Sequence, residues 1–201
     1  MPKILVTGMS GTGKSTALRI LALRGHRTVD TDTDQWSHWV TAPDGSSDWI
    51  WREDAISALL DGHGSGSLFV AGCKTNQGRF YPRFDHIVLL SAPAEILLAR
   101  IAARTDNPYG KEPAERDLIL QHLAEVEPLL RATASVEIDA SAPILDVVQQ
   151  LEALIEHLSD KPRHAPRRSD ADPAPEPAST QTGAVGSSTQ PQCPHPPAAG
   201  T

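Results

Sequence analysis

The sequence predicts an α/β domain of three layers, in which helices cover both faces of a five-stranded parallel sheet. Short apolar runs alternate along the chain with segments of helical periodicity. Several of these runs are continuously apolar, as in strands buried on both faces. From Asp160 onward the chain is rich in Pro, Ala, Ser, Thr and Gly and has almost no large apolar residues. We therefore expect a folded domain over residues 1–159 and a disordered tail over residues 160–201.

The first half of the predicted domain contains three of the strands and two helices. A helix should follow the first strand and end near Gly25, a residue typical of a helix C-cap. The spacing of apolar residues over Trp49–Leu60 predicts a second helix, with its apolar side buried. The five expected strands are Lys3–Thr7, Arg27–Val29, Ser67–Ala71, His86–Leu90 and Val136–Ile138.

Three helical segments are predicted in the second half of the domain. Pro93 suits the start of a helix that runs to about Arg104. A later helix ends near Arg131, and Pro128 should bend or break it, because proline lacks the backbone donor that a helix interior needs. Ile144–Leu158 has the apolar spacing of an amphipathic final helix.

The composition of the chain indicates which binding partners and which cell compartment to expect. The 25 acidic and 18 basic residues give a formal net charge of -7, which disfavours nucleic acid as a partner. Cys73 and Cys193 are far apart, so neither a disulfide framework nor a zinc site is indicated. No apolar segment approaches the length of a membrane span. We expect a cytoplasmic protein without a membrane partner.

Residues Gly8–Ser15 read GMSGTGKS and match the phosphate-binding pattern G-x-x-x-x-G-K-[ST] between a predicted strand and a predicted helix. In that context backbone N–H groups and the helix N-terminus face the phosphates. Lys14 would reach the β and γ phosphates, and the Ser15 hydroxyl would bind Mg²⁺. The sequence therefore predicts ATP and Mg²⁺ as cofactors. The loop residues expected to bind them are Gly8, Ser10, Gly11, Thr12, Gly13, Lys14, Ser15 and Thr16.

Acidic residues gather after the second strand, whereas neither of the long apolar strands, Ser67–Ala71 and His86–Leu90, ends in the aspartate typical of P-loop ATPases, and no N-K-x-D motif for guanine occurs. Asp30-Thr31-Asp32 resembles the D-[ST]-D segment of shikimate kinases. The order of elements resembles the P-loop kinases of the nucleoside monophosphate, shikimate and gluconate kinase group, among the AAA-type ATP-binding proteins. This resemblance implies the strand order 2-3-1-4-5. It also implies that Asp30 helps to hold Mg²⁺ and that Asp32 orients or deprotonates the acceptor hydroxyl.

Arg100 and Arg104 share one face of the helix that follows the fourth strand. A similar pair leads into the mobile lid of adenylate kinases. By that resemblance Arg100 packs on the adenine and Arg104 meets the charge of the transferred phosphoryl group. A solvated helix face is the alternative. A short lid is expected over residues 105–112, and Ser141–Pro143 lies where these kinases wrap backbone around adenine.

The acceptor is expected to bind near the polar segment Gly72–Arg79 (GCKTNQGR), which suits a hydroxylated or anionic compound. Its cysteine and lysine are loosely similar to those of gluconate kinases. Four tryptophans lie in the segment that should cover this pocket, and we favour their packing in a small helical subdomain over ligand stacking. Asp34 could act in the site or merely cap a loop. The residues expected to bind the acceptor are Asp32, Asp34, Gly72, Asn76, Gln77 and Arg79.

These observations favour a small-molecule or nucleotide kinase that transfers the γ-phosphoryl group of ATP to a hydroxyl or a phosphate. Its catalytic residues would be Lys14, Asp32 and Arg104. One alternative is an ATP-binding regulatory module or an ATPase without a small-molecule acceptor. Another is a kinase that acts on nucleic-acid ends, which the negative charge disfavours. The sequence leaves the acceptor and the oligomeric state open.

Overall fold

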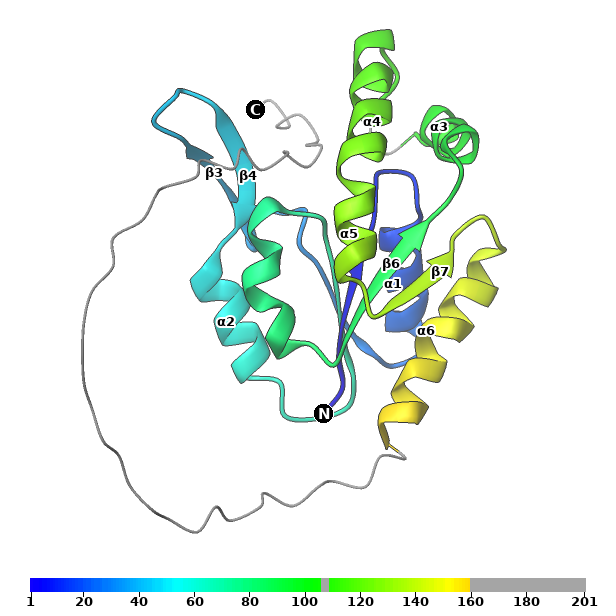
Figure 1. The fold of residues 1–201 in the computed structure, drawn as a ribbon. Helices are drawn as coiled ribbons and strands as arrows, with labels where there is room; N and C mark the ends of the chain where they lie inside the picture. Colours follow the sequence, from blue (N-terminus) through cyan, green and yellow to red (C-terminus); the bar gives the residue numbers. More distant parts are fainter. Residues whose placement is uncertain (106–108, 160–201) are drawn as a thin grey trace, which may run out of the picture.

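The central sheet has five parallel strands: β1 (Lys3–Thr7), β2 (Arg27–Asp30), β5 (Leu68–Ala71), β6 (His86–Ser91) and β7 (Val136–Asp139). In this computed structural model, which describes residues 1–105 and 109–159, they lie in the order β2-β5-β1-β6-β7 (Figure 1). Counted within the sheet, this is the predicted order 2-3-1-4-5, which is confirmed. The tail predicted over residues 160–201 lies outside the described residues.

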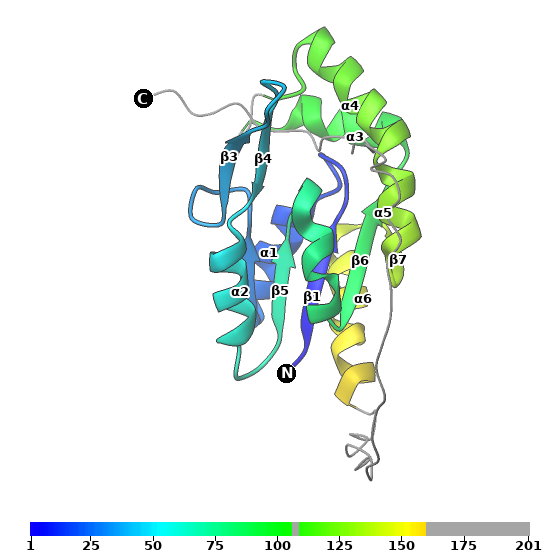
Figure 2. The same cartoon turned by 60° about the vertical axis from the view of Figure 1, so that its left-hand side comes forward.

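Helices cover both faces of the sheet because side chains alternate between its faces. In β1, Ile4 and Val6 belong to one apolar cluster and Leu5 to the other, and all three are fully buried. One face carries α1 (Lys14–Leu23) and α6 (Ile144–Ser159), and the other carries α2 (Glu53–Asp61), the 3₁₀ helix η1 (Thr75–Arg83) and α5 (Glu127–Thr133) (Figures 1 and 2). The predicted three-layer α/β class is confirmed.

Helices α3 (Ala94–Ala103) and α4 (Pro113–Glu125) stand beyond the carboxyl end of the sheet (Figure 1). Pro93 precedes α3 and Arg104 caps its end, as predicted. The predicted break at Pro128 is also present, because α4 ends at Glu125 and Pro128 lies in the first turn of α5. No helix among the described residues is long and apolar enough to cross a membrane.

A β-hairpin rises from the carboxyl end of β2, where a helical subdomain was expected. Its strands are β3 (Ser37–Thr41) and β4 (Ser47–Trp51), and Trp39 lies directly opposite Trp49. The rings of these two tryptophans are 5.2 Å apart. The helix predicted over Trp49–Leu60 is therefore wrong in its first part, since α2 begins at Glu53.

Two signals in the sequence explain the hairpin. Trp49 and Trp51 are separated by one residue and both are buried on the same face of β4, a period of two that is typical of a strand. The segment Pro43-Asp44-Gly45 carries the chemistry of a turn, and Gly45 adopts a positive φ of 85°. The predicted helix wrongly combined the end of β4 with α2, although β4 ends at Trp51 and α2 begins at Glu53.

Candidate active site

The phosphate-binding loop between β1 and α1 depends on glycine at its first position. Gly8 has a φ of 142°, and a Cβ built there would lie 2.3 Å from the main-chain oxygen of Leu90 in β6. At Gly11, with a φ of 88°, a Cβ would lie 2.9 Å from the main-chain oxygen of Leu97. Side chains are excluded at both positions, so β6 and α3 can pack directly against the loop backbone.

The N-terminus of α1 is open to an anion. Gly13 occupies the N-cap position without a side-chain hydrogen bond, and the first turn contains no acidic residue. Lys14 folds back over the loop, where its Nζ donates to the main-chain oxygens of Gly8 at 2.7 Å and Met9 at 3.0 Å. Thr12 donates its hydroxyl to the oxygen of Met9 at 2.9 Å. Uncapped N–H groups and a nearby ammonium suit a phosphate group.

Ser15 and Asp30 meet beside this loop. The Ser15 hydroxyl donates to Asp30 Oδ2 at 2.6 Å, and Asp30 Oδ1 accepts the backbone N–H of Asp32 at 3.1 Å. Hydroxyl and carboxylate oxygens are the ligands that Mg²⁺ prefers. The structure thus places together the two residues that the sequence assigned to the metal, and their chemistry fits it.

Asp32 forms an ion pair that the sequence analysis missed. Lys74 Nζ lies 2.6 Å from Asp32 Oδ1, and the Lys74 side chain is 1% exposed while that of Asp32 is 42% exposed. The available signal was a lysine three residues after the end of the buried apolar strand β5, because a buried cation there needs a counterion. Asp34 is exposed, and among the described residues its side chain makes no hydrogen bond or ion pair.

Of the other expected acceptor residues, Asn76 and Gln77 direct their polar groups into the protein, and Gly72 has no side chain. Gly72 leaves room for a buried threonine, because a Cβ there would lie 2.1 Å from Thr31 Oγ1. The side-chain amide of Asn76 forms two hydrogen bonds with the backbone of Trp51: it accepts the N–H and donates to the C=O, each at 3.0 Å. Gln77 is buried and donates to the hydroxyl of Tyr81 at 3.0 Å. Direct binding of the acceptor by these side chains stays a prediction.

Arg79 is exposed near the base of the hairpin. Its guanidinium donates to Glu53 Oε1 at 2.5 Å, where Glu53 is the first residue of α2. It therefore links η1 to α2. Its expected contact with the acceptor also stays a prediction.

Arg100 and Arg104, both predicted to act on the nucleotide, contact different segments. Arg100 donates to the main-chain oxygen of Ala140 at 2.7 Å, beside the segment expected to wrap around adenine. Arg104 donates to Ser10 Oγ at 3.4 Å and to the main-chain oxygen of Tyr109 at 2.7 Å. Arg104 therefore joins the loop to the base of the predicted lid, of which residues 106–108 lie outside the described part. Burial raises the pKa of the Tyr109 hydroxyl above its ordinary value.

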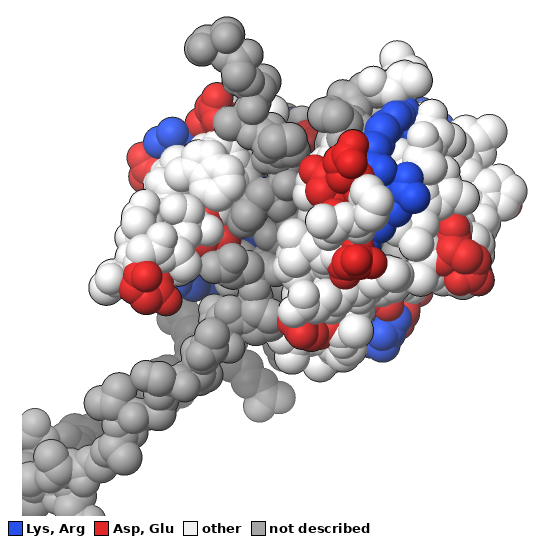
Figure 3. Space-filling model, turned by 90° about the horizontal axis from the view of Figure 1, so that it is seen from above, with Lys and Arg blue, Asp and Glu red and all other residues white. Residues whose placement is uncertain are grey.

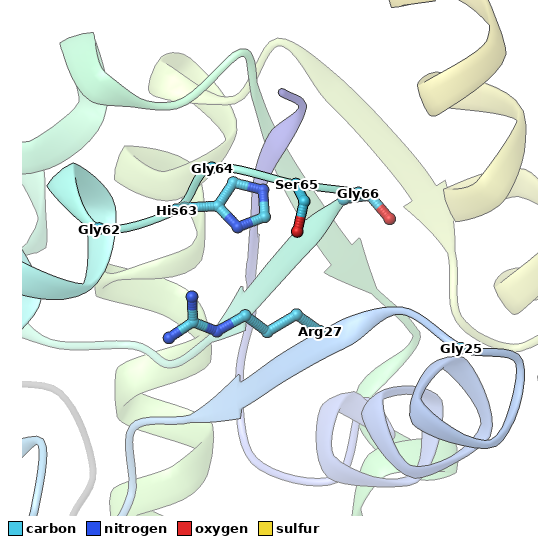
Figure 4. Close-up of a pocket in the computed structure, with 8 residues that line it drawn as sticks. Gly25, Arg27, Gly62, His63, Gly64, Ser65 and Gly66 are labelled. Atoms are coloured by element: carbon cyan, nitrogen blue, oxygen red, sulfur yellow. The ribbon is translucent and has the colours of Figure 1, made fainter.

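A separate pocket of about 310 Å³ lies at the opposite end of the sheet, where β2 and β5 begin (Figure 4). It is lined by Gly25, Arg27 and residues 62–67, none of which the sequence assigns to ATP or the acceptor. Burial, followed by the charges of Arg27 and Lys3, lowers the pKa of His63 in its wall. The pocket is remote from the phosphate-binding loop.

Comparisons with known proteins agree with this geometry. A family model described as AAA domain matches residues 4–121, more than half of the chain. A shikimate kinase from Rhodopseudomonas palustris is 33% identical over 139 residues, which cover 64% of this chain and 68% of that protein. This chain belongs to the AAA domain family and to the shikimate kinase-like group of P-loop kinases.

Further relatives of this kinase support the same group. A shikimate kinase from Psychrobacter cryohalolentis is 28% identical over 151 residues, covering 68% of this chain and 78% of that protein. The solved shikimate kinase from Acinetobacter baumannii, in complex with shikimate, has a TM-score of 0.54 at 24% identity and covers 80% of this chain and 95% of its own. The enzyme from Bacteroides thetaiotaomicron has a TM-score of 0.56 at 22% identity, covering 77% and 98%. These two structures share its fold. The protein is an ATP-dependent phosphotransferase.

Proposed function

We propose that this kinase transfers the γ-phosphoryl group of ATP to a hydroxyl of a low-molecular-weight acceptor bound between the phosphate-binding loop and the hairpin. One observation carries the proposal. The open helix N-terminus, the Ser15–Asp30 pair and the Asp32–Lys74 pair all lie at the carboxyl end of the sheet, in the segments where β1, β2 and β5 end and in those that follow them. Ligands of open α/β sheets bind at this end.

The nucleotide side of the site would bind and orient phosphate groups. Backbone N–H groups of the loop and of α1 would receive the phosphate oxygens, and Lys14 would exchange its bonds to the Gly8 and Met9 carbonyls for phosphate contacts. Ser15 and Asp30 would hold Mg²⁺, which, when bound, neutralises charge on the β and γ phosphates. Arg104, already next to Ser10, would bring positive charge to the γ-phosphoryl group.

The acceptor side would depend on Asp32. Its carboxylate is partly exposed, so one oxygen can accept the hydrogen bond of an acceptor hydroxyl while Lys74 holds the other side. This contact aligns the hydroxyl oxygen with the γ-phosphoryl group, and the carboxylate can take the hydroxyl proton as transfer proceeds. Lys74 is a positioning residue here, since it acts through Asp32. We expect this reaction to take place in the cytoplasm.

The test measures label transfer from γ-labelled ATP in Mg²⁺ to panels of sugars, cyclitols, sugar acids and nucleosides. Lys14→Ala serves as the control for loop-dependent chemistry. Asp32→Asn should lower kcat by about a hundredfold or more, because an amide cannot accept the proton, and should leave the Kd for ATP within about twofold. Asp32→Asn with wild-type turnover would show that another residue receives the acceptor, and a wild-type enzyme that labels no acceptor would refute the proposed reaction.

A further inference from the structure

The cavity of about 310 Å³ at the start of β2 and β5 lies outside the kinase site. It is formed between Arg27 of β2 and the glycine-rich segment 62–67 (GHGSGS), which joins α2 to β5. The two strands run from this cavity toward the kinase site, where Asp30 ends β2 and Lys74 follows β5. A ligand in the cavity would therefore contact neither ATP nor the acceptor.

The walls of this cavity are polar and carry no carboxylate. Of the described residues, those that line it are four glycines, two serines, Arg27 and His63. At the carboxyl end of the sheet, by contrast, acidic and basic side chains are exposed close together (Figure 3). The cavity thus offers a cation without a neighbouring acid in its wall and no large apolar surface. These walls suit a small anionic ligand.

The guanidinium of Arg27 is free to bind such an anion. Arg27 is exposed, and within the described part of the chain its side chain forms no hydrogen bond or ion pair. Nearby basic groups differ, because Arg24 and His26 both contact Glu152. A guanidinium has five N–H donors in a planar fork that matches the oxygens of an anion. In Arg27 all five are available.

His63 faces Arg27 across the cavity. The residue is 6% exposed, and its Nε2 has no hydrogen-bond partner among the described residues. Figure 4 shows its ring and the Ser65 hydroxyl on the side of the loop that faces Arg27. A buried polar atom without a partner destabilises the fold until one is supplied. A ligand that enters the cavity supplies a partner for this ring.

The glycine-rich loop adds backbone donors. In the described chain the N–H groups of Gly64, Ser65 and Gly66 form no hydrogen bond. A Cβ built at Gly64 or Gly66 would meet no atom within 4 Å, so packing does not cover the backbone there. Unpaired N–H groups of such loops bind phosphate oxygens. Because the donors come from β2 and from the loop on different sides, a tetrahedral phosphate fits them better than a planar carboxylate.

We propose that this cavity is a second phosphate-binding site of the protein, separate from the loop that binds ATP. Its ligand is free phosphate or the phosphate monoester of a small compound. Arg27 pairs with the phosphate oxygens, and the loop N–H groups and the His63 ring complete the contacts. Ligand pockets span about 300–1,000 Å³, so a cavity of about 310 Å³ has room for a small organic group beside the phosphate.

Titration calorimetry on the full chain tests this site. A non-hydrolysable ATP analogue and Mg²⁺ are present at saturation, so that the ATP-binding loop is filled. The probes are inorganic phosphate, glycerol 3-phosphate and glycerate, a carboxylate of similar size. We expect one phosphate or one phosphate ester per chain, and glycerate binding at least about tenfold weaker because its planar group uses fewer donors. Glycerol 3-phosphate binding more tightly than phosphate identifies an ester as the ligand, and equal affinities identify free phosphate.

Arg27→Gln is the decisive variant and Arg19→Gln its matched control. Arg19 is an exposed arginine of α1 that does not line the cavity, so both variants remove one surface charge. Arg27→Gln should weaken binding at least about tenfold, whereas Arg19→Gln should keep the Kd within about twofold. Thermal unfolding would confirm that both variants fold. The proposal is overturned if the wild type binds no phosphate, if glycerate binds equally well, or if the two variants have the same Kd.

NMR of the His63 ring gives an independent readout. Burial lowers the pKa of His63, and the positive charges of Arg27, Lys3 and the Met1 amino group lower it further. A phosphate beside the ring favours the charged imidazolium, so the pKa should rise when the ligand binds. The ring signals, assigned by comparison with His63→Gln, should shift on addition of glycerol 3-phosphate and titrate at higher pH. Ring signals that stay unchanged at saturation would place the ligand elsewhere and overturn the proposal.

Discussion

The Asp32–Lys74 pair should respond unequally to removal of either partner. Asp32→Asn leaves an ammonium that is 1% exposed without its counterion, whereas Lys74→Met leaves a carboxylate that is 42% exposed and can be hydrated. Breaking a buried pair on one side costs about 3–5 kcal/mol. We expect about 3 kcal/mol for Asp32→Asn, the lower end, because water reaches one side of the pair. Lys74→Met should cost only about 1 kcal/mol, as for an exposed pair, since methionine fills most of the vacated volume.

Urea denaturation and calorimetry at neutral pH would measure the difference. For a domain of this size roughly 2–4 °C of Tm is lost per kcal/mol, so we expect about 6–12 °C for Asp32→Asn and about 2–4 °C for Lys74→Met. The double variant should resemble Lys74→Met, because no buried charge is left unpaired. Asp34→Asn, at an exposed carboxylate, is the control and should change stability by less than about 0.5 kcal/mol. Equal losses for the two single variants would refute the assignment of Asp32 as the counterion of a buried Lys74.

Three other changes test the loop and a surface ion pair. Gly8→Ala should abolish ATP binding or folding, because its Cβ would lie 2.3 Å from the Leu90 oxygen; normal nucleotide titration by calorimetry would contradict this. Ser15→Ala should weaken the binding of a non-hydrolysable ATP analogue about tenfold in Mg²⁺ but leave it unchanged in EDTA. Glu137→Gln should lower the free energy of unfolding at pH 7. The hydrogen bond from Arg131 lowers the pKa of Glu137 below its ordinary value of 4.5, so the ion pair stabilises the fold above that pH and this stabilisation is lost on acidification. Urea denaturation of wild type and variant across pH would show the difference.

The parallel sheet could be predicted from sequence because its determinants are local. Residues of β1 and β6 form continuous apolar runs, and the phosphate-binding pattern between β1 and α1 combines required glycines with a required lysine. Each of these signals can be read within about ten residues. The break between α4 and α5 was also local, since a single proline at position 128 prevents continuation of the helix.

The hairpin and the ion pair were harder because they depend on distant partners. The tryptophans around Trp49 suit either an amphipathic helix or a strand, and their packing is settled by Trp51, whose indole nitrogen donates to Thr31 twenty positions away in the chain. Lys74 lies 42 positions from Asp32 in the chain, and no sequence pattern in the intervening residues indicates that the two form an ion pair. Contacts across neighbouring strands of a parallel sheet leave no local pattern.

Asn76 shows how such contacts change the interpretation of a polar residue, and it offers a decisive test. Its amide accepts the N–H and donates to the C=O of Trp51, so it holds the hairpin against η1. Asn76→Ala removes both hydrogen bonds, at about 1 kcal/mol each, and should lower Tm by roughly 4–8 °C. A looser hairpin should also raise KM for the acceptor without changing the Kd for ATP. If Asn76 instead binds the acceptor directly, the same variant raises KM with an unchanged Tm. Thermal unfolding and steady-state kinetics on one preparation therefore separate a residue that shapes the acceptor site from one that contacts the acceptor.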